Sequence, residues 1–348
     1  MKRRYVHIYQ CKPGYILADD VYDEKGILIV SKYTMIDDYI IKRLKDFRIR
    51  QLYIYEDEEV DYNEAKKAYI AHLKRDYKKN VNIMKQLIND LAAGRKLDYE
   101  RVKYISDSVY SRISNITNIP EYMNVVKDID EYTYRHSINV SIYAFFIAKW
   151  LGMEESEIKD IITTGILHDI GKSRIPDNIL NKKGPLLPEE FEKMKEHTGI
   201  GYKLSLDIAY LTDEIREGIL MHHENEDGSG YPYGLKGEKI NTYAKIIAIA
   251  DVYDALTSER VYKKRNTPFD AFGEIIRMGY SKFDAKILMT FLTNICGYYI
   301  GSMVKMNNGQ IGQVIFISPL RISKPIVSVD GRCIDLSRKK YFRIDEML

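Results

Sequence analysis

The chain has 348 residues, 53 of them basic and 50 acidic, so its formal net charge is only +3. Such a balance produces no strong field toward anionic partners, and we expect neither a nucleic acid polymer nor a membrane surface as its partner. Hydrophobic residues make up 45% and charged residues 30% of the chain. This globular composition excludes intrinsic disorder and a fibrous architecture, and the length allows two or three domains.

The sequence shows neither a signal peptide nor the cysteine spacing of a disulfide framework or a zinc site. The N-terminus lacks the apolar stretch of a signal peptide, and the most apolar segment, Ile142–Leu151, contains Lys149 and is too short to span a bilayer. We therefore expect a cytoplasmic protein. The three cysteines form no Cys-x-x-Cys pair, which favours reduced thiols and leaves histidine and carboxylate side chains as the ligands of any metal.

Residues 1–60 alternate apolar and polar positions in short runs and predict a small β-rich N-terminal module. Its one helical stretch lies near Ile36–Phe47, and the strand-like segment Gln51–Tyr55 follows. The acidic run Glu56–Glu59 is typical of a linker, so we place a domain boundary near residue 60. No motif in this module identifies a ligand, and its regulatory partner stays open.

A helix with one apolar face is predicted over residues 63–93, within a region of linker helices that extends from 61 to 109. The positions on this face are Ile70, Leu73, Tyr77, Asn80, Met84, Leu87 and Leu91. The face fits a homodimeric coiled coil in which Asn80 sets the register. It fits equally a helix that packs against its neighbour in the same chain, and the sequence does not decide between the two.

Residues 98–300 are mostly helix-compatible, in segments that glycine and proline separate. We expect helices over 98–117, 132–151, 154–169, 188–206, 212–224, 242–258, 268–278 and 284–296. Residues 301–348 return to short alternating runs and predict a short C-terminal β unit. The expected fold class is therefore mainly α, with an all-helical bundle domain over 110–300 between two small β-rich parts.

Five of the seven histidines fall in the helical region, together with aspartates on apolar helices. The set is His136, His168, Asp169, His197, His222, His223 and Asp251. Each residue alone fits an ordinary hydrogen-bonded side chain, but an unpaired ionised carboxylate such as Asp251 is costly to bury. Together they favour nitrogen and oxygen ligation of two divalent ions. Two ions about 3.5 to 4 Å apart suit hydrolysis of a phosphate ester by an activated water.

Several motifs in this region resemble a known family. His168-Asp169-Ile170-Gly171-Lys172 is similar to the signature of HD-superfamily phosphohydrolases. The longer run from His222 to Pro232, HHENEDGSGYP, is similar to the signature of the HD-GYP subgroup. Further matches lie at 132–140, 197–202 and 250–256, and the resemblance covers about residues 110–295.

The resemblance implies a bacterial signalling enzyme, a phosphodiesterase that hydrolyses cyclic di-GMP to pGpG and onward to GMP, with iron or manganese as its metals. It implies that one ion is held by His136, His168, Asp169 and Asp251. It implies that Asp169 bridges to a second ion held by His197, His222 and His223. Lys172 matches the family lysine that approaches the scissile phosphate, so Asp169 and Lys172 are the expected catalytic residues.

Three residues are expected to contact the substrate. Tyr231, in the glycine-rich loop, is placed to contact a phosphate or stack on a base. The resemblance assigns Arg260 and Lys263 to gripping phosphates, a role that suits the bidentate guanidinium of arginine. We interpret Glu224 and Asp227 as groups that brace the loop rather than as metal ligands.

Two features leave alternatives open. Some family members hold a third metal through a glutamate four residues before the first histidine ligand, where this chain has Tyr132. Glu131 is one position out of register, so we predict two metals rather than three. The alternative functions are a catalytically silent sensor or scaffold that binds a cyclic dinucleotide, and an HD phosphohydrolase that acts on another cyclic dinucleotide.

Overall fold

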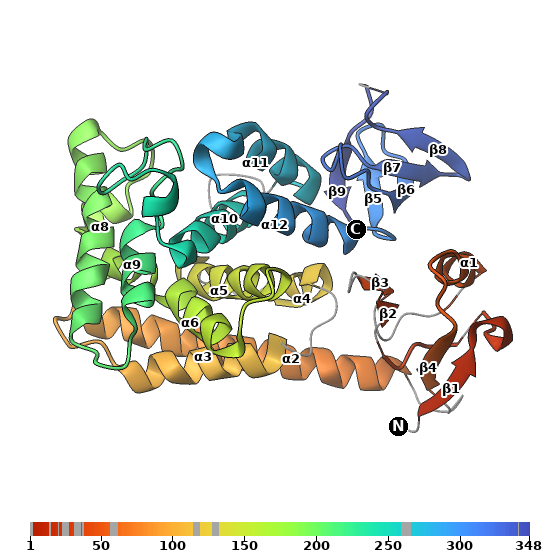
Figure 1. Ribbon diagram of the computed structural model, residues 1–348, viewed down its shortest axis with the longest axis horizontal. Helices are drawn as coiled ribbons and strands as arrows, with labels where there is room; N and C mark the ends of the chain where they lie inside the picture. Colours follow the sequence, from red (N-terminus) through yellow and green to blue (C-terminus); the bar gives the residue numbers. More distant parts are fainter. Residues whose placement is uncertain are drawn as a thin grey trace. The chain divides into compact units, whose positions relative to one another are not determined.

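The computed structural model describes residues 3–13, 15–19, 21–22, 28–30, 36, 38–55, 62–113, 119–126, 132–258, 266–339 and 341–348. Their packing divides the chain into two compact units, of which one contains the N-terminal strands and the other contains most of the helices and the C-terminal sheet (Figure 1). Over these ranges, the structure contains no helix with both the length and the apolarity needed to cross a membrane.

The N-terminal module consists of short antiparallel strand pairs and one helix. β1 (Arg3–His7) pairs with β4 (Gln51–Tyr55), and β2 (Val21–Tyr22) pairs with β3 (Leu28–Val30). The 3-10 turn η1 (Ile8–Gln10) follows β1, and α1 (Asp38–Asp46) precedes β4. Alternate residues of β4, Leu52 and Ile54, are buried in a small apolar core. The prediction of a β-rich module with a single helix is confirmed for the described part.

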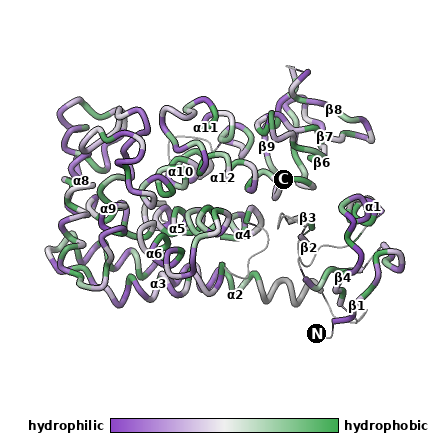
Figure 2. The backbone as a smooth tube through the Cα atoms, viewed as in Figure 1, coloured by the Kyte–Doolittle hydropathy of each residue, from purple (hydrophilic) through white to green (hydrophobic). Residues whose placement is uncertain are grey.

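The long helix α2 (Tyr62–Ala92) turns back into α3 (Tyr99–Ile113). Figure 2 shows hydrophobic and hydrophilic residues alternating along α3, as a helix with one covered face requires. The apolar face of α2 is buried at positions from Tyr77 to Leu91, and Asn80 donates from Nδ2 to Ser108 Oγ on α3 at 3.1 Å. This part of the face is therefore covered within the chain, and a homodimer through residues 63–93 stays a prediction.

The remaining helices follow the predicted segments closely, except for the short helices Ile119–Val126 and Asp177–Leu180, which the sequence does not predict. In chain order the remaining helices are α4 (Ile119–Val126), α5 (Tyr132–Trp150), α6 (Glu155–Leu167), α7 (Asp177–Leu180), α8 (Pro188–Leu206), α9 (Asp213–Met221), α10 (Thr242–Thr257), α11 (Pro268–Lys282) and α12 (Ala285–Gly297). Two 3-10 turns, η2 (Ile170–Arg174) and η3 (Gly237–Lys239), lie between them. α5 packs on α6 and α10, while α9 packs on α6, α8 and α10 (Figure 1). The mainly helical fold class is confirmed.

The contact between α5 and α6 depends on a glycine. A Cβ atom on Gly165 would lie 2.6 Å from Ser141 Cα, a separation that side chains do not tolerate. The absent side chain lets the backbones of the two helices approach closely. This approach places the C-terminal end of α6, where the His-Asp pair lies, beside α5.

The C-terminal β unit is a five-stranded antiparallel sheet with the strand order β8-β7-β6-β5-β9. Its strands are β5 (Met303–Met306), β6 (Ile311–Phe316), β7 (Ile326–Val329), β8 (Arg332–Asp335) and β9 (Ile344–Met347). Buried and exposed residues alternate along β5, with Val304 and Met306 inside. The expected C-terminal β unit is therefore confirmed.

Candidate metal centre

The predicted ligands come from helix interiors and from the turns where helices end. His136 lies in α5, His197 in α8 and Asp251 in α10. His168 caps the C-terminus of α6 and Asp169 precedes η2, while His222 caps the C-terminus of α9 and His223 follows it. Where a helix ends, the chain presents adjacent side chains in different directions. Each adjacent pair can therefore serve more than one ion.

A second glycine brings the His-Asp turn against α8. A Cβ atom on Gly171 would lie 1.9 Å from the carbonyl oxygen of His197. Only a residue without a side chain fits at this approach. Gly171 thereby holds η2, and with it Asp169, close to the helix that carries His197.

The structure brings all seven predicted ligands together in two adjacent groups. One group is Asp169, His197, His222 and His223, and the other is His136, His168 and Asp251. Within each group the potential ligand atoms lie within 4.8 Å of one another. Residues separated by more than a hundred positions in sequence thus form one buried constellation.

Asp169 lies between the histidines of both groups. Its Oδ1 is 3.4 Å from His197 Nε2 and 3.9 Å from His222 Nε2. Its Oδ2 is 3.4 Å from His168 Nε2 and 3.7 Å from His136 Nε2. Because the two oxygens face different imidazoles, this carboxylate has the geometry of a group that bridges two cations.

Three of the imidazoles are oriented by their own helices. His168, His197 and His222 each donate from Nδ1 to the carbonyl oxygen three residues earlier, at 2.8, 2.7 and 2.8 Å respectively. Because a carbonyl oxygen only accepts, Nδ1 carries the proton in each neutral ring. The lone pair is therefore on Nε2, the atom that faces Asp169.

His136 is oriented differently, by a carboxylate on another helix. Its Nδ1 donates to Asp254 Oδ2 at 2.7 Å, and its Nε2 is 3.1 Å from Asp251 Oδ1. Asp251 and Asp254 are one turn apart on α10, so this helix holds both nitrogens of the ring. Asp254 is fully buried and also accepts from Asn139 Nδ2 at 2.9 Å. A carboxylate behind a ligating histidine is a common way to fix the ring of a metal ligand.

Several buried nitrogen and oxygen atoms of the constellation are placed to bind a cation. Among the described residues, His168 Nε2 and Asp169 Oδ1 are buried and have no hydrogen-bond partner. His197 Nε2 and His222 Nε2 are 3.5 Å apart although each carries a lone pair in its neutral ring. Facing lone pairs repel unless a positive charge lies between or beside them. The donor set of imidazole nitrogens and carboxylate oxygens is the one that divalent transition metals prefer.

Burial and neighbouring charges together set the protonation states of the candidate ligands. Burial lowers the pKa of His197 to about 4 and that of His223 to about 3, so both rings are neutral at pH 7. Burial raises the pKa of Asp169, but Lys172 and His168 outweigh this effect and hold that pKa well below its ordinary value. His136 behaves in the opposite way: burial lowers its pKa, yet hydrogen bonds to Asp251 and Asp254 raise it to about 10. The pair of carboxylates around His136 thus favours a positive charge.

Lys172 lies directly at the bridging carboxylate. Its Nζ donates to Asp169 Oδ2 at 2.6 Å, and about a third of its side chain is exposed. The side chain of Lys172 is thus only partly buried, while its amino group contacts the Asp169 carboxylate. This position allows it to interact with an anionic group that enters the site.

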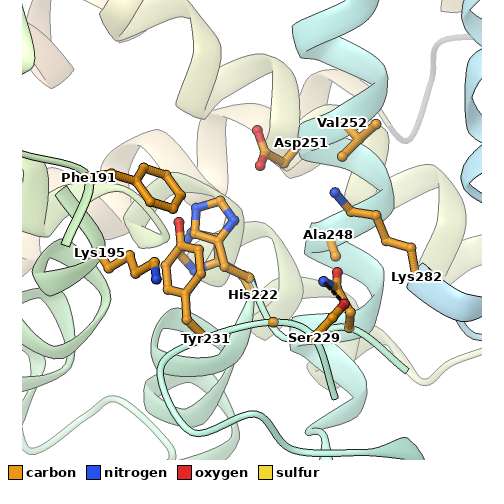
Figure 3. A pocket seen from close by; sticks show the side chains of 12 residues that line it. Phe191, Lys195, His222, Ser229, Tyr231, Ala248, Asp251, Val252 and Lys282 are labelled. Carbon is orange, nitrogen blue, oxygen red and sulfur yellow. Dashed lines mark hydrogen bonds between the residues drawn. The ribbon is translucent and has the colours of Figure 1, made fainter. Parts of the chain in front are cut away.

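A cavity of about 270 Å³ opens onto the constellation. His222, His223 and Asp251 form part of its wall, and the remaining lining residues include two lysines, Lys195 of α8 and Lys282 at the end of α11. Figure 3 shows these lysines on opposite sides of the cavity, with His222 between them. The cavity therefore combines candidate metal ligands in its wall with positive charge on two sides.

The glycine-rich loop covers one side of the cavity. The Tyr231 ring lies 4.7 Å from the His223 ring, centroid to centroid, and Lys195 Nζ is 5.6 Å from the Tyr231 ring (Figure 3). Glu224 is buried and accepts from the backbone N–H groups of Tyr233 at 2.7 Å and Leu235 at 2.9 Å. It thus braces the loop, as the sequence indicates, and Asp227 accepts from Ser229 N at 2.8 Å.

Some predicted residues fall outside what the structure describes. Arg260 and Lys263, the expected phosphate contacts, lie outside the described residues, as does Glu131. The helix α5 begins at Tyr132, whose side chain is likewise not described. The assignments of Arg260 and Lys263 and the count of two metals therefore stay predictions.

Comparison with known proteins connects this geometry to a family. The HD domain family model matches residues 120–287. Cyclic di-GMP phosphodiesterase PA4108 of Pseudomonas aeruginosa is 32% identical over 229 residues, which cover 66% of this chain and 55% of that protein. A cyclic di-GMP phosphodiesterase of Thermotoga maritima is 40% identical over 177 residues, 49% of this chain and 48% of the relative. The chain contains an HD domain and is similar to the HD-GYP family.

These matches cover only part of each protein. The chain spans about half the length of the curated relatives it matches. A solved structure, Bd1817, an HDG"Y"P protein from Bdellovibrio bacteriovorus, covers 83% of this chain with a TM-score of 0.50 and 19% identity, and 98% of that protein is covered. At that identity the likeness concerns the fold alone.

Three polar residues of this site have no role assigned from the sequence. Asp254 lies inside a motif, yet nothing in its spacing shows that it faces His136 rather than a metal. Lys195 and Lys282 come from helices whose relative placement is a tertiary property. A search for lysines two residues from a predicted ligand would have found Lys195, whereas Lys282 has no sequence signal.

Proposed function

We propose that this protein is a metal-dependent phosphodiesterase that hydrolyses cyclic di-GMP to pGpG, with GMP as the product of a second hydrolysis. Water adds to phosphorus and the bond from phosphorus to the ribose O3′ breaks, which opens the ring and leaves a 5′-phosphate. The observation that carries the proposal is the position of Asp169, whose two oxygens face different histidines. One of its oxygens also faces His222, which lines an accessible cavity.

The metal content is part of the same proposal. We propose two divalent ions, iron or manganese, one held by His197, His222 and His223 and the other by His136, His168 and Asp251, with Asp169 shared between them. When bound, such ions supply Lewis acidity at the phosphate and lower the pKa of water. The unpartnered buried atoms of His168 and Asp169 support this assignment.

The chain's own residues bind and orient the substrate. Lys172, beside Asp169, is placed to stabilise negative charge that develops on the phosphate under attack. Burial raises the pKa of Tyr231, so its phenol stays protonated and can donate a hydrogen bond to a phosphate oxygen. Arg260 and Lys263 remain proposed phosphate contacts on the basis of the family motif.

The two cavity lysines suit a substrate with two phosphates. A cyclic dinucleotide carries one phosphate that reacts and a second one across the ring. Lys195 and Lys282 lie on opposite sides of the cavity (Figure 3), so positive charge is available for a phosphate on either side of the metal ligands. This arrangement supports a cyclic dinucleotide as the substrate class.

Two alternatives are retained for the test. A catalytically silent sensor needs no complete ligand set, whereas all seven positions are filled here. Hydrolysis of another cyclic dinucleotide uses the same metal ligands, because the fold and the metal site do not determine which base is read. In this proposal residues 110–300 form the catalytic domain, and residues 1–60 form a regulatory module that residues 61–109 connect to it.

The test is a turnover assay with product separation. Protein loaded with Mn²⁺ or Fe²⁺ is incubated with cyclic di-GMP or with cyclic GMP-AMP, and the products are separated by chromatography. We expect metal-dependent formation of pGpG, loss of turnover in Asp169→Asn, and wild-type turnover in Asp330→Asn, an exposed turn residue. Metal-loaded protein that binds cyclic di-GMP without hydrolysing it would identify a sensor. Turnover of cyclic GMP-AMP alone would identify the other substrate.

A further inference from the structure

A line of buried hydrogen bonds connects helix α2 to the metal ligands. Tyr77 on α2 donates from its hydroxyl to Asn139 Oδ1 at 2.6 Å. Asn139 Nδ2 donates to Asp254 Oδ1 at 2.9 Å, and Asp254 Oδ2 accepts from His136 Nδ1 at 2.7 Å. The line therefore runs from Tyr77 to His136 through residues of α5 and α10.

The direction of every hydrogen bond in this line is determined by chemistry. The carboxylate of Asp254 only accepts, so Asn139 must offer its amide nitrogen to it. The amide oxygen of Asn139 then faces Tyr77, whose hydroxyl is the donor. Turning the amide of Asn139 around would place oxygen against oxygen at Asp254. Asp254 thus determines the orientation of the Asn139 amide, and the Tyr77 hydroxyl stabilises this orientation by donating to the amide oxygen.

The line is shielded from water along its whole length. The exposed fractions of the side chains are 1% for Tyr77, 4% for Asn139 and 0% for Asp254. A buried polar group that loses its partner finds no water to replace it, and the lost bond costs about 1 to 3 kcal/mol. Loss of the first bond is therefore felt by Asn139 rather than being compensated by solvent. Asp254 feels it less strongly, because its Oδ1 also accepts from Ser258 Oγ at 2.9 Å.

We propose that Tyr77 is a positioning residue for the metal centre. Through Asn139 and Asp254 it holds the ring of His136 so that Nε2 faces Asp251, at 3.1 Å, and Asp169. In this proposal Tyr77 acts on the ligand constellation through Asn139 and Asp254. The proposal rests on the metal centre of the proposed function, but it does not depend on which phosphodiester is hydrolysed.

Tyr77 also lies close to the point on α2 where the two compact units are divided. α2 is one continuous helix whose first part, up to Arg75, belongs to the unit that contains the N-terminal strands. Tyr77 follows that division by two residues and belongs to the unit that contains the metal ligands. A rotation or shift of α2 would move the Tyr77 hydroxyl relative to Asn139, so the helix that leaves the N-terminal module carries the first member of the line.

The Tyr77→Phe variant tests the role of the hydroxyl without changing the packing of the ring. The substitution removes the hydroxyl and keeps the ring, which is fully buried. Tyr243→Phe is the matched control, because Tyr243 is also buried and lies on the same helix as Asp254, but outside the line. Asp254→Asn, which alters the group in direct contact with His136, is the reference for a large effect.

The experiment measures metal binding instead of turnover. Stripped proteins are titrated with Mn²⁺ by calorimetry, and the absorption spectrum of the Co²⁺-loaded proteins reports the ligand geometry. Partners that orient a metal ligand alter metal affinity by about 10- to 100-fold when they are mutated, and Tyr77→Phe, which acts two residues further away, should weaken Mn²⁺ binding by about 3- to 10-fold. We also expect a changed Co²⁺ spectrum, while Tyr243→Phe matches the wild type in both measurements.

Each outcome of this experiment decides the proposal. The proposal is supported if Tyr77→Phe weakens Mn²⁺ binding and alters the Co²⁺ spectrum, with a smaller loss of affinity than in Asp254→Asn. This result supports it even if cyclic di-GMP proves not to be the substrate. A Tyr77→Phe protein with wild-type affinity and spectrum overturns it. Equal effects of Tyr77→Phe and Tyr243→Phe also overturn it, because they would show a general response to a lost buried hydroxyl.

Discussion

The imidazoles of the ligand constellation are oriented in two contrasting ways. His168, His197 and His222 are each oriented by a carbonyl oxygen three residues earlier in the same helix. His136 is oriented by Asp254, which is 118 positions away in sequence. A ring that is hydrogen-bonded to its own helix keeps its orientation relative to that helix even if the helix moves. The orientation of His136, in contrast, requires that α5 and α10 are packed correctly. The first arrangement is local and robust, and the second is sensitive to tertiary changes.

The largest expected effect comes from separating a locally held imidazole from the rest of the site. Gly171→Ala inserts a Cβ atom where the carbonyl oxygen of His197 already lies 1.9 Å away, so the backbone of η2 and α8 must separate. We expect a loss of about 3 kcal/mol in the free energy of unfolding, together with weaker metal binding. Urea denaturation measures the first effect. Gly199→Ala is the control, because its Cβ meets no atom within 4 Å and alanine favours a helix. Equal stability of the two variants would contradict this account.

The next effect tests the imidazole held from another helix. Asp254→Asn preserves the shape of the side chain but replaces one acceptor oxygen with a donor nitrogen, so His136 Nδ1 loses its charged partner. We expect Mn²⁺ affinity to fall about 10- to 100-fold, measured by calorimetry on stripped protein. The fold should survive, so the circular dichroism spectrum should remain that of the wild type. An unchanged affinity would show that His136 needs no partner beyond its own helix.

A smaller effect is expected at the loop that covers the cavity. Glu224→Ala removes the acceptor of two backbone N–H groups, those of Tyr233 and Leu235, and should loosen the loop that carries Tyr231. Because the metal ligands remain in place, we expect KM for cyclic di-GMP to rise about 10-fold, about 1.4 kcal/mol, with metal content unchanged. Steady-state kinetics and metal analysis on the same preparation check this. Loss of metal would instead assign Glu224 to the ligand shell.

The smallest effect is expected at the cavity lysine on α11. Lys282 is partly exposed, so its interaction with a phosphate is screened by water. Lys282→Ala should raise KM about 5-fold and leave kcat within about 2-fold of the wild type. Lys286→Ala, an exposed residue of α12, serves as the control. Identical KM values for the two variants would remove Lys282 from the substrate site.

The contrast between local and tertiary orientation also explains which features the sequence predicts. The predicted helices over 132–151 and 188–206 correspond to α5 and α8 within one residue at each end, because apolar periodicity and end signals are local properties. The candidate ligands can be named from the sequence because the motifs around His168 and His222 are contiguous. The eight-residue helix α4 was missed, since a short helix gives little periodicity.

The remaining features of the site depend on contacts that no local pattern encodes. The hydrogen bonds from Tyr77 to Asn139 and from Asn139 to Asp254 join residues 62 and 115 positions apart. Tyr77 was identified only as a member of an apolar helix face, a description that is correct for its ring and silent about its hydroxyl. Lys282 enters the cavity because of where α11 ends relative to α8 and α10. Such roles become visible only when the helices are packed.

The central claim is that the two groups of ligands hold a pair of divalent ions that share Asp169. Metal analysis by mass spectrometry, on protein purified without chelators and on protein reloaded with Mn²⁺, tests this claim most directly. We predict about two ions per chain in the wild type and fewer than one in Asp169→Asn, because a shared ligand serves both sites. A wild-type protein that retains no metal, or one that holds about three ions per chain, would contradict the account.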